Sequence, residues 1–351
     1  MLRSHNIVCC CILVAARSQS ASGPCDITIE NSIVCEAANQ QALKLMGERH
    51  VRAIMVMQDV RTGSVLAFAA SDPKSVDVTT SLLPLSTVKL LVAASWLNHQ
   101  KYAPSDFPAG KLLMDSIANG NDDAGRQLAS ALRKQIGTET AIRDFEAYGF
   151  PFSNSATTAQ NESFWSEISP VWRGKLIPGA CYFSLNTETT TKDWEDTLSI
   201  GEAHFMITAL HLSRFLQAVG NRGIMLPPKA RSSDEAEVAS QAQPHRIMDE
   251  AAASELGNVM RQTVERGTAK NIAPILAGTG WSIGGKTGTG PGPNSPERTS
   301  DGWFAGLIFD PQGDARFTVA TFVKHGGLGG GNAAWLSAEL ARFVIGVPPK
   351  S

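Results

Sequence analysis

The sequence predicts an α/β protein built on one antiparallel five-stranded sheet, with the helices from both ends of the chain packed on it. Three observations lead to this fold class: two strand-like runs near the start, three near the end, and mainly helical patterns between them. Strands in two separate groups join most simply in one sheet, because a single packed core then covers all of them. The helical middle is expected to be an inserted lobe.

The composition is that of a folded protein without a strong field of either charge. Of 351 residues, 43% are hydrophobic and 18% are charged, which provides for a sizeable core and excludes a disordered chain. The 31 basic residues nearly balance the 33 acidic ones, and the basic residues are scattered. Nucleic-acid binding, which needs a clustered positive surface, is therefore excluded.

The first residues have the pattern of a secretory leader. Arg3 precedes an uninterrupted apolar run of ten residues, 7–16, and a small, polar stretch follows it. Ten residues are too few to cross a bilayer, which takes about 20, and the order basic, apolar, small is typical of a signal peptide. We expect residues 1–24 to be a leader and 25–351 to be exported, to the periplasm or the extracytoplasmic face of the cell envelope. The alternative is a misassigned start codon.

Three cysteines lie beyond the leader, Cys25, Cys35 and Cys181. In an exported protein Cys25 and Cys35 can close a disulfide, and two free thiols remain the alternative. No Cys or His spacing is typical of zinc. Neither a metal nor another cofactor is expected.

The chain begins its folded part with a helix and a hairpin. A helical pattern covers residues 36–49, and apolar runs over 51–60 and 64–71 flank the turn 61–63. Residues 36–80 are expected to form the first part of an α/β lobe.

The middle of the chain, 81–249, is expected to be the helical lobe. Residues 151–200 show no clear periodicity and are expected to be irregular, and 230–245 is expected to be an exposed loop. Apolar residues recur at helical spacing over four segments, 86–100, 122–134, 138–148 and 208–219.

The end of the chain, 250–351, completes the α/β lobe. A helix is expected over 250–266 and another over 333–345, with strands between them at 281–287, 302–309 and 317–324. The two lobes are thus interleaved in sequence. Ligand sites favour such junctions between lobes.

Ser86 and Lys89 form the first pattern that carries chemistry. Residues three apart share one face of a helix, so the hydroxyl and the amine come within hydrogen-bond reach. A serine hydroxyl attacks an acyl carbon poorly unless a base takes its proton, and a desolvated lysine near another cation can serve as that base. S-x-x-K alone has little specificity, because such a pattern is usually a helix cap with an exposed lysine.

The second pattern is Lys286-Thr287-Gly288-Thr289, and two interpretations compete for it. Residues 280–287 also fit the nucleotide-binding pattern G-x-x-x-x-G-K-[ST]. That mechanism needs a helix to begin at the Lys-Thr pair, whereas glycines and prolines follow here, so nucleotide binding is rejected. A K-T-G strand is favoured: Lys286 supplies a cation for a substrate carboxylate and helps to lower the pKa of Lys89, while Gly288 lets substrate approach the backbone.

Ser-x-x-Lys followed by Lys-Thr-Gly is the pairing of penicillin-binding proteins and β-lactamases. Over most of residues 36–345 the chain resembles the transpeptidase domain of penicillin-binding proteins. Further similar segments occur in the family's order: the hairpin 59–70 with its R-T-G turn, then 200–202, 208–212, 221–223, 267–269 and 301–306. Each motif alone has little specificity, but their order is specific. The resemblance implies a β-lactamase/transpeptidase-like fold.

One motif departs from the family pattern. Between the two lysine motifs the family has S-x-N, whose Ser relays a proton and whose Asn holds a substrate amide. The nearest match is Asn119-Gly120-Asn121, in which Asn121 stands for the family Asn and Asn119 replaces the Ser. Asn119 cannot shuttle a proton, and the register Gly120-Asn121-Asp122 matches no better. The alternative is a polar helix start that Asn121 caps.

The resemblance implies a serine acyltransferase that acts on the D-alanyl-D-alanine end of a peptidoglycan stem peptide. β-Lactams would be acylating inhibitors, and no metal, cofactor, nucleotide or nucleic acid is implied; other cell-wall enzymes as partners stay open. The N–H groups of Ser86 and Thr289 would form an oxyanion hole. The resemblance assigns catalytic roles to Ser86, Lys89, Asn121 and Lys286, and substrate binding to Asn119, Thr287, Gly288 and Thr289.

Two alternatives to a transpeptidase or carboxypeptidase remain. A β-lactamase of the same fold would hydrolyse its acyl-enzyme, for which Glu162 or Glu167 is the candidate base. A non-catalytic β-lactam sensor is the other alternative, which the altered second motif leaves open.

Overall fold

The computed structural model of the protein describes residues 33–72, 80–100, 108–151, 181–186, 188–201, 205–228, 243–291 and 300–347. The expected leader, Cys25 and most of the expected loop 230–245 lie outside these residues. Within the described ranges, no helix is both long enough and apolar enough to span a membrane.

The predicted antiparallel five-stranded sheet is confirmed, with strand order β2-β1-β9-β8-β7. All four neighbouring strand pairs are antiparallel, so the two early strands and the three late ones form one sheet. The first hairpin and the last strand meet where β1 pairs with β9 along its whole length. The strands are β1 (Arg52–Asp59), β2 (Val65–Ala70), β7 (Ser282–Gly290), β8 (Asp301–Phe309) and β9 (Ala315–Lys324).

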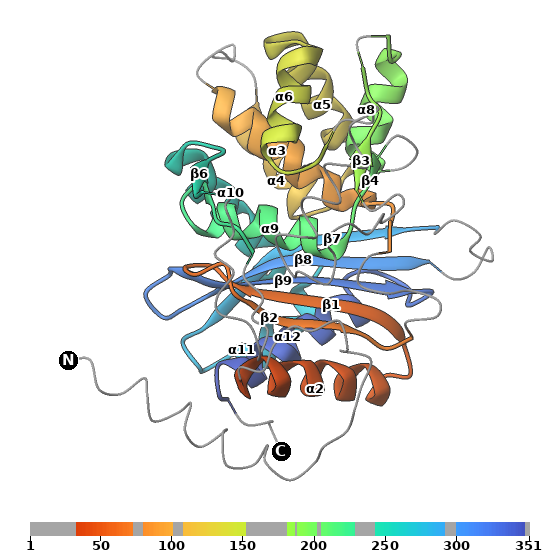
Figure 1. Cartoon of the computed structure of the whole chain (residues 1–351). Helices are drawn as coiled ribbons and strands as arrows, with labels where there is room; N and C mark the ends of the chain where they lie inside the picture. Colours follow the sequence, from red (N-terminus) through yellow and green to blue (C-terminus); the bar gives the residue numbers. More distant parts are fainter. Residues whose placement is uncertain are drawn as a thin grey trace, which may run out of the picture.

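Helices cover both faces of this sheet (Figure 1). Below it in Figure 1 lie α2 (Ile33–Glu48) and α12 (Asn332–Val344), which confirms that both terminal helices pack on the sheet. On the opposite face lie α9 (Ala209–Gly220), against β1 and β9, and α10 (Glu250–Glu265), against β7. The predicted lobe boundaries remain a prediction, and α9 falls within the range assigned to the helical lobe.

Strand β1 shows why the sheet strands read as nearly continuous apolar runs. Its side chains alternate between the two faces: Ile54 and Val56 belong to the core toward α9 and the helical lobe. Ala53, Met55 and Met57 belong to the core toward α2 and α12. Because helices cover both faces of the sheet, the side chains on both faces are buried, and the alternation of apolar and polar residues that is typical of a half-exposed strand is absent.

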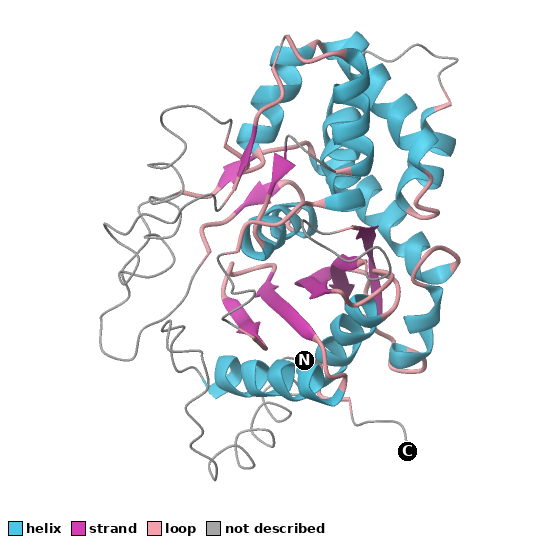
Figure 2. Cartoon of the chain, turned by 90° about the vertical axis from the view of Figure 1, so that its right-hand side faces the viewer, coloured by secondary structure: helices cyan, strands magenta, loops and turns pink. Residues whose placement is uncertain are grey.

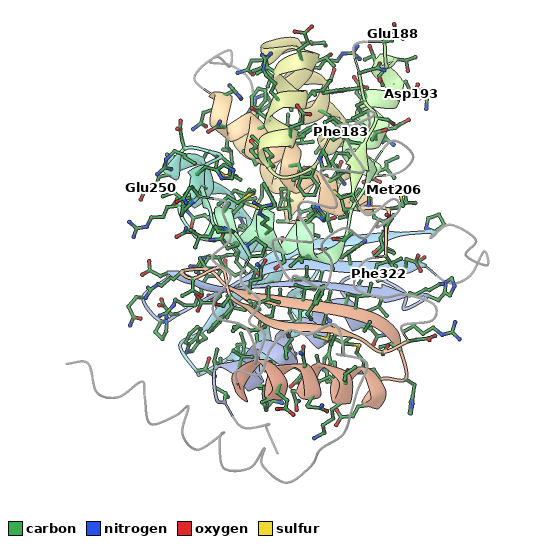
Figure 3. The ribbon with its side chains drawn as sticks, viewed as in Figure 1. Phe183, Glu188, Asp193, Met206, Glu250 and Phe322 are labelled. Atoms are coloured by element: carbon green, nitrogen blue, oxygen red, sulfur yellow. The ribbon has the colours of Figure 1, made fainter. Side chains whose placement is uncertain are left out.

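Five further helices stand beyond α9 and α10, in the upper part of Figures 1 and 2. Aromatic rings fill the core beside them: Phe183 stacks on Phe205 at 5.5 Å and meets Phe145 edge-on at 5.9 Å. Figure 3 labels Phe183 in this region and Phe322 in the sheet. The elements are α3 (Lys89–His99), α4 (Ala109–Ile117), α5 (Asp122–Ile136), α6 (Thr138–Ala147) and α8 (Thr191–Ile200), with short ribbons β3 (Tyr182–Phe183) with β4 (Phe205–Met206) and β5 (Ile224–Met225) with β6 (His245–Arg246). The short α11 (Ala273–Leu276) precedes β7.

The prediction that residues 151–200 are irregular is wrong at their end, where α8 forms. The Thr190 side chain accepts a hydrogen bond from the Asp193 N–H, which caps the helix, and Gly201 ends it in a left-handed conformation. A threonine followed three residues later by an acid is a helix-start signal, so the sequence carried the information. The unpredicted α4 is likewise amphipathic and buries Leu112, Leu113 and Ile117. The expected loop also ends in a short strand, β6.

Gly125 allows α3, α5 and α8 to pack closely. A Cβ atom on Gly125 would lie 2.8 Å from Lys89 Cε and 2.5 Å from Ser199 Oγ, which is too close for either contact. Ser199 Oγ in turn donates to the backbone carbonyl of Asp122 at 2.7 Å. The absence of a side chain at this position therefore sets the place of the Lys89 stem.

The Gly125→Ala variant is expected to be less stable than the wild type, by about 1–2 kcal/mol. An overpacked contact costs about 1–3 kcal/mol, and the better helix propensity of alanine returns up to about 1 kcal/mol. The matched control is Gly47→Ala in α2, where a Cβ would meet nothing within 4 Å, so this variant is expected to gain stability. Urea unfolding of both variants measures the difference. Equal stability of the two variants would contradict the packing argument.

Candidate active site

Ser86 lies in a single 3₁₀ turn, η2 (Leu85–Val88), that leads directly into α3. Its side chain is partly buried, and its hydroxyl makes no hydrogen bond to any described residue. The preceding residue, Leu85, has φ of +51°, a left-handed conformation that is unfavourable for a branched side chain. The expected helix from residue 86 is thus present, and its first turn is the tighter 3₁₀ form.

Two hydrogen bonds hold this turn in place. The Leu85 N–H donates to the Gly201 carbonyl at 3.1 Å, which joins the turn to the end of α8. From the sheet, Trp303 Nε1 donates to the Leu83 carbonyl at 2.9 Å. The end of α8 and strand β8 therefore both fix the position of Ser86.

Lys89 is buried, with 1% of its side chain exposed. Its ammonium group donates to Asp122 Oδ1 at 2.6 Å and to the Gly120 carbonyl at 3.3 Å. Burial lowers the pKa of Lys89, and the Asp122 carboxylate offsets part of this effect. A lysine in this state is closer to neutrality than an exposed one, as a general base requires.

Lys286 lies on β7, the outermost strand on its side of the sheet, and its side chain is fully buried. Its Nζ donates to the Thr287 carbonyl at 2.7 Å. Burial and then the positive charge of Lys89 lower its pKa well below the usual value, while the charge of Asp122 acts in the opposite direction. A Cβ atom on Gly120 would lie 3.8 Å from Lys286 Nζ. The lysines of the two motifs therefore flank the segment 120–122 together.

Gly288 brings β7 against the Ser86 turn. A Cβ atom on Gly288 would lie 3.3 Å from Leu85 Cβ and 3.1 Å from Trp303 Cβ, so a side chain here would require these neighbours to shift by a few tenths of an ångström. The contact between β7 and η2 places the two predicted motifs, which are 200 residues apart in sequence, on the two sides of one site.

The hydroxyls of the two β7 threonines are both hydrogen-bonded. Thr287 Oγ1 bonds to Thr268 Oγ1 at 2.7 Å, and the exposed Thr289 accepts from the Gly329 N–H through Oγ1 at 2.9 Å. The glycine-rich turn 326–331 therefore packs on the end of β7. An edge strand also presents backbone groups without a strand partner, which suits a site that binds an extended peptide.

The structure gives the two asparagines of the second motif other contacts than the lysines. Asn121 Oδ1 accepts from the Ala124 N–H at 2.8 Å and caps α5. Asn119 Nδ2 donates to Asp115 Oδ1 at 3.0 Å on an exposed surface. The roles of Asn119 and Asn121 in catalysis and substrate binding stay predictions.

Asp122 is the residue that the sequence reasoning did not assign. Its carboxylate contacts Lys89, and Gly120 faces Lys286. The three residues at the position of the family motif are therefore Gly120, Asn121 and Asp122, and not 119–121. A signal was available: a buried lysine requires an acceptor, and acids directly follow the motif. Glu162 and Glu167 lie outside the described residues.

The chain belongs to the penicillin binding protein transpeptidase domain family. The family model matches residues 155–342, which is more than half of the chain. The matched segment includes Lys286, Thr287, Gly288 and Thr289 and begins after Ser86 and Lys89. No curated protein matches the sequence.

Solved structures of penicillin-binding proteins share the fold at low sequence identity. The transpeptidase domain of penicillin-binding protein 3 from Burkholderia pseudomallei aligns over 94% of this chain and 100% of its own, with 17% identity and a TM-score of 0.65. PBP2 from Pseudomonas aeruginosa, in complex with WCK 5153, aligns over 90% of this chain and 74% of its own, with 18% identity and a TM-score of 0.65. Penicillin-binding protein 3 from Mycobacterium tuberculosis, in complex with aztreonam, aligns over 92% and 79%, with 17% identity and a TM-score of 0.61.

Substitutions at Asn121 distinguish a helix cap from a catalytic group. Asn121→Ala is expected to lower the free energy of unfolding by about 1 kcal/mol, because the Ala124 N–H loses its acceptor. Asn121→Ser keeps a capping oxygen and is expected to retain both stability and the rate of labelling by a fluorescent penicillin. Urea unfolding and labelling rates measure the two effects. A stable Asn121→Ser variant that labels much more slowly would instead support the predicted catalytic role.

Proposed function

We propose that this protein is a serine acyltransferase that acts on the D-alanyl-D-alanine end of peptidoglycan stem peptides, as a D,D-transpeptidase or carboxypeptidase. One observation carries the proposal: Lys89 and Lys286 are both buried, both have lowered pKa values, and both flank the segment 120–122 beside the Ser86 turn. Two buried amines with lowered pKa values, next to a serine without a hydrogen-bond partner among the described residues, suit activation of that serine.

In the proposed acylation, the Ser86 hydroxyl attacks the carbonyl carbon of the penultimate D-alanine. Lys89 accepts the hydroxyl proton as the C–O bond forms, and the N–H groups of Ser86 and Thr289 stabilise the oxyanion. The C–N bond then breaks, the amine of the leaving D-alanine takes a proton from the site, and an ester on Ser86 remains. Lys286, with Thr287 and Thr289 beside it on β7, would hold the terminal carboxylate.

The second half of the proposed reaction removes the acyl group from Ser86. An amine of a second stem peptide attacks the ester in transpeptidation, and water attacks it in carboxypeptidation. In either case the Ser86 oxygen recovers a proton as the C–O bond breaks. A β-lactam would acylate Ser86 by the same first step, with the opened ring still attached to the carbonyl.

The altered second motif supports one alternative, a protein that binds β-lactams without efficient turnover. Gly120 supplies no hydroxyl next to Lys286, where the family pattern has a serine that relays a proton. A sensor would keep the acyl group on Ser86 and would not release D-alanine from a peptide. Since the proposed peptide substrate lies outside the cytoplasm, we also propose export to the periplasm or the outer face of the cell envelope, with residues 1–24 as the leader.

Ser86→Ala is expected to abolish covalent labelling by a fluorescent penicillin while leaving the fold intact, since the side chain makes no hydrogen bond to the described residues. Denaturing gel electrophoresis measures the label, and circular dichroism controls for folding. Normal labelling of the variant would refute Ser86 as nucleophile. The wild type distinguishes the three candidate functions. A stable label together with D-alanine release from a stem-peptide mimic supports the proposed enzyme, and a stable label without release supports the sensor. Rapid loss of the label with consumption of penicillin supports a β-lactamase.

Asp122→Asn is expected to move the acid limb of the acylation rate to lower pH. The carboxylate raises the pKa of Lys89 by a hydrogen bond and by its charge, so its removal lets burial lower that pKa further. Lys89 is then neutral, and able to accept a proton, at a lower pH. Rates of penicillin labelling between about pH 5 and about pH 10 measure the shift. An unchanged limb, or one moved to higher pH, would show that Asp122 does not control the base.

A further inference from the structure

A carboxylate, not an amide, stands beside the proposed base. Asp122 Oδ1 accepts from Lys89 at 2.6 Å, while Oδ2 has no hydrogen-bond partner among the described residues. The side chain of Lys89 is 1% exposed, but that of Asp122 is 49% exposed. One oxygen of Asp122 is therefore bound to the buried lysine, and the other is open to a ligand.

An amide and a carboxylate select different groups on a ligand. An asparagine side chain both donates and accepts hydrogen bonds, so it can hold an amide group through its carbonyl and its N–H. An ionised carboxylate only accepts. At the place where the family pattern holds a substrate amide, Asp122 therefore favours an N–H donor and disfavours a carbonyl oxygen.

The charge of Asp122 becomes available during the proposed reaction. Before acylation, Asp122 is paired with the Lys89 ammonium group. In the form that acts as a base, Lys89 is neutral, and the carboxylate has lost the charge of its partner. A cationic group on the substrate compensates this charge in the reactive state of the enzyme, which favours acylation and not only binding.

We infer that Asp122 forms a subsite for an ammonium or other N–H donor group on the acyl side of the bond that Ser86 attacks. This inference rests on the proposed function, since it concerns the substrate class of the same site. The acyl donors it favours are peptides, or β-lactams, that carry an amine next to the acyl carbonyl or on the first residue before it. Asp123, the neighbouring acid, takes no part: its side chain is 85% exposed and pairs with Arg126 at 3.0 Å.

Ampicillin and benzylpenicillin test the subsite, because they differ only by an amino group on the side chain. The readout is the ratio of their second-order acylation rates on the full-length chain, measured by competition with a fluorescent penicillin. We expect the wild type to favour ampicillin by about tenfold, as for a partly exposed charge-assisted hydrogen bond. The ratio is expected to fall toward one in Asp122→Asn, and to fall with rising salt in the wild type.

The ratio separates the subsite from the effect of Asp122 on Lys89. A change in the base alters both acylation rates alike and leaves their ratio unchanged. Asp123→Asn is the matched control, with the same chemical change one residue away, and is expected to keep the wild-type ratio. A wild type that reacts equally with both penicillins, or a preference that Asp122→Asn retains, overturns the subsite and leaves the proposed function standing. Failure of the wild type to react with either penicillin overturns the proposed function itself.

Discussion

The burial of two lysines beside each other is the constraint on which the rest of the site depends. Removing an ammonium group from water costs several kcal/mol, and a second positive charge nearby adds to that cost. Lys89 and Lys286 are 1% and 0% exposed. Among the described residues, three acceptors offset this cost: the Asp122 carboxylate and the Gly120 carbonyl for Lys89, and the Thr287 carbonyl for Lys286. What remains uncompensated lowers both pKa values, which is the property that the proposed chemistry needs.

The backbone around the site is arranged to allow this crowding. Leu85 takes a left-handed conformation, which costs about 1–3 kcal/mol for a residue other than glycine. The hydrogen bonds from Leu85 to Gly201 and from Trp303 to Leu83 hold the strained turn from both lobes. At Gly125 a side chain would clash with the Lys89 stem, and at Gly288 a Cβ atom would make tight contacts with Leu85 and Trp303. The end of α8 and strand β8 therefore both hold this turn.

The sheet and the two lysine motifs could be predicted from the sequence, for physical reasons. Strands buried on both faces leave long apolar runs, such as 53–57, and K-T-G stands on an edge strand whose glycine permits close contact with the Ser86 turn. The register of the second motif, in contrast, could not be predicted from the sequence. Whether Asn121 or Asp122 faces Lys89 depends on which residue becomes the helix cap, and a one-residue change in the helix start rotates every following side chain. The capping signal at Thr190 was present but lay within a segment without apolar periodicity.

Gly120 and Asp122 together determine which groups can carry the proton that leaves Ser86 in the proposed reaction. A hydroxyl both donates and accepts, so a serine beside Lys286 can pass a proton from one amine to a leaving group. Gly120 has no hydroxyl; its carbonyl accepts from Lys89, and its φ of +70° is a conformation that other residues rarely adopt. In the proposed reaction, the proton that leaves Ser86 therefore stays on the Lys89–Asp122 pair, and it reaches the leaving amine from Lys89 or through water. In the proposed reaction Lys89 carries the proton while Asp122 anchors it, so substrate charge, base strength and leaving-group protonation all depend on the Asp122 side chain.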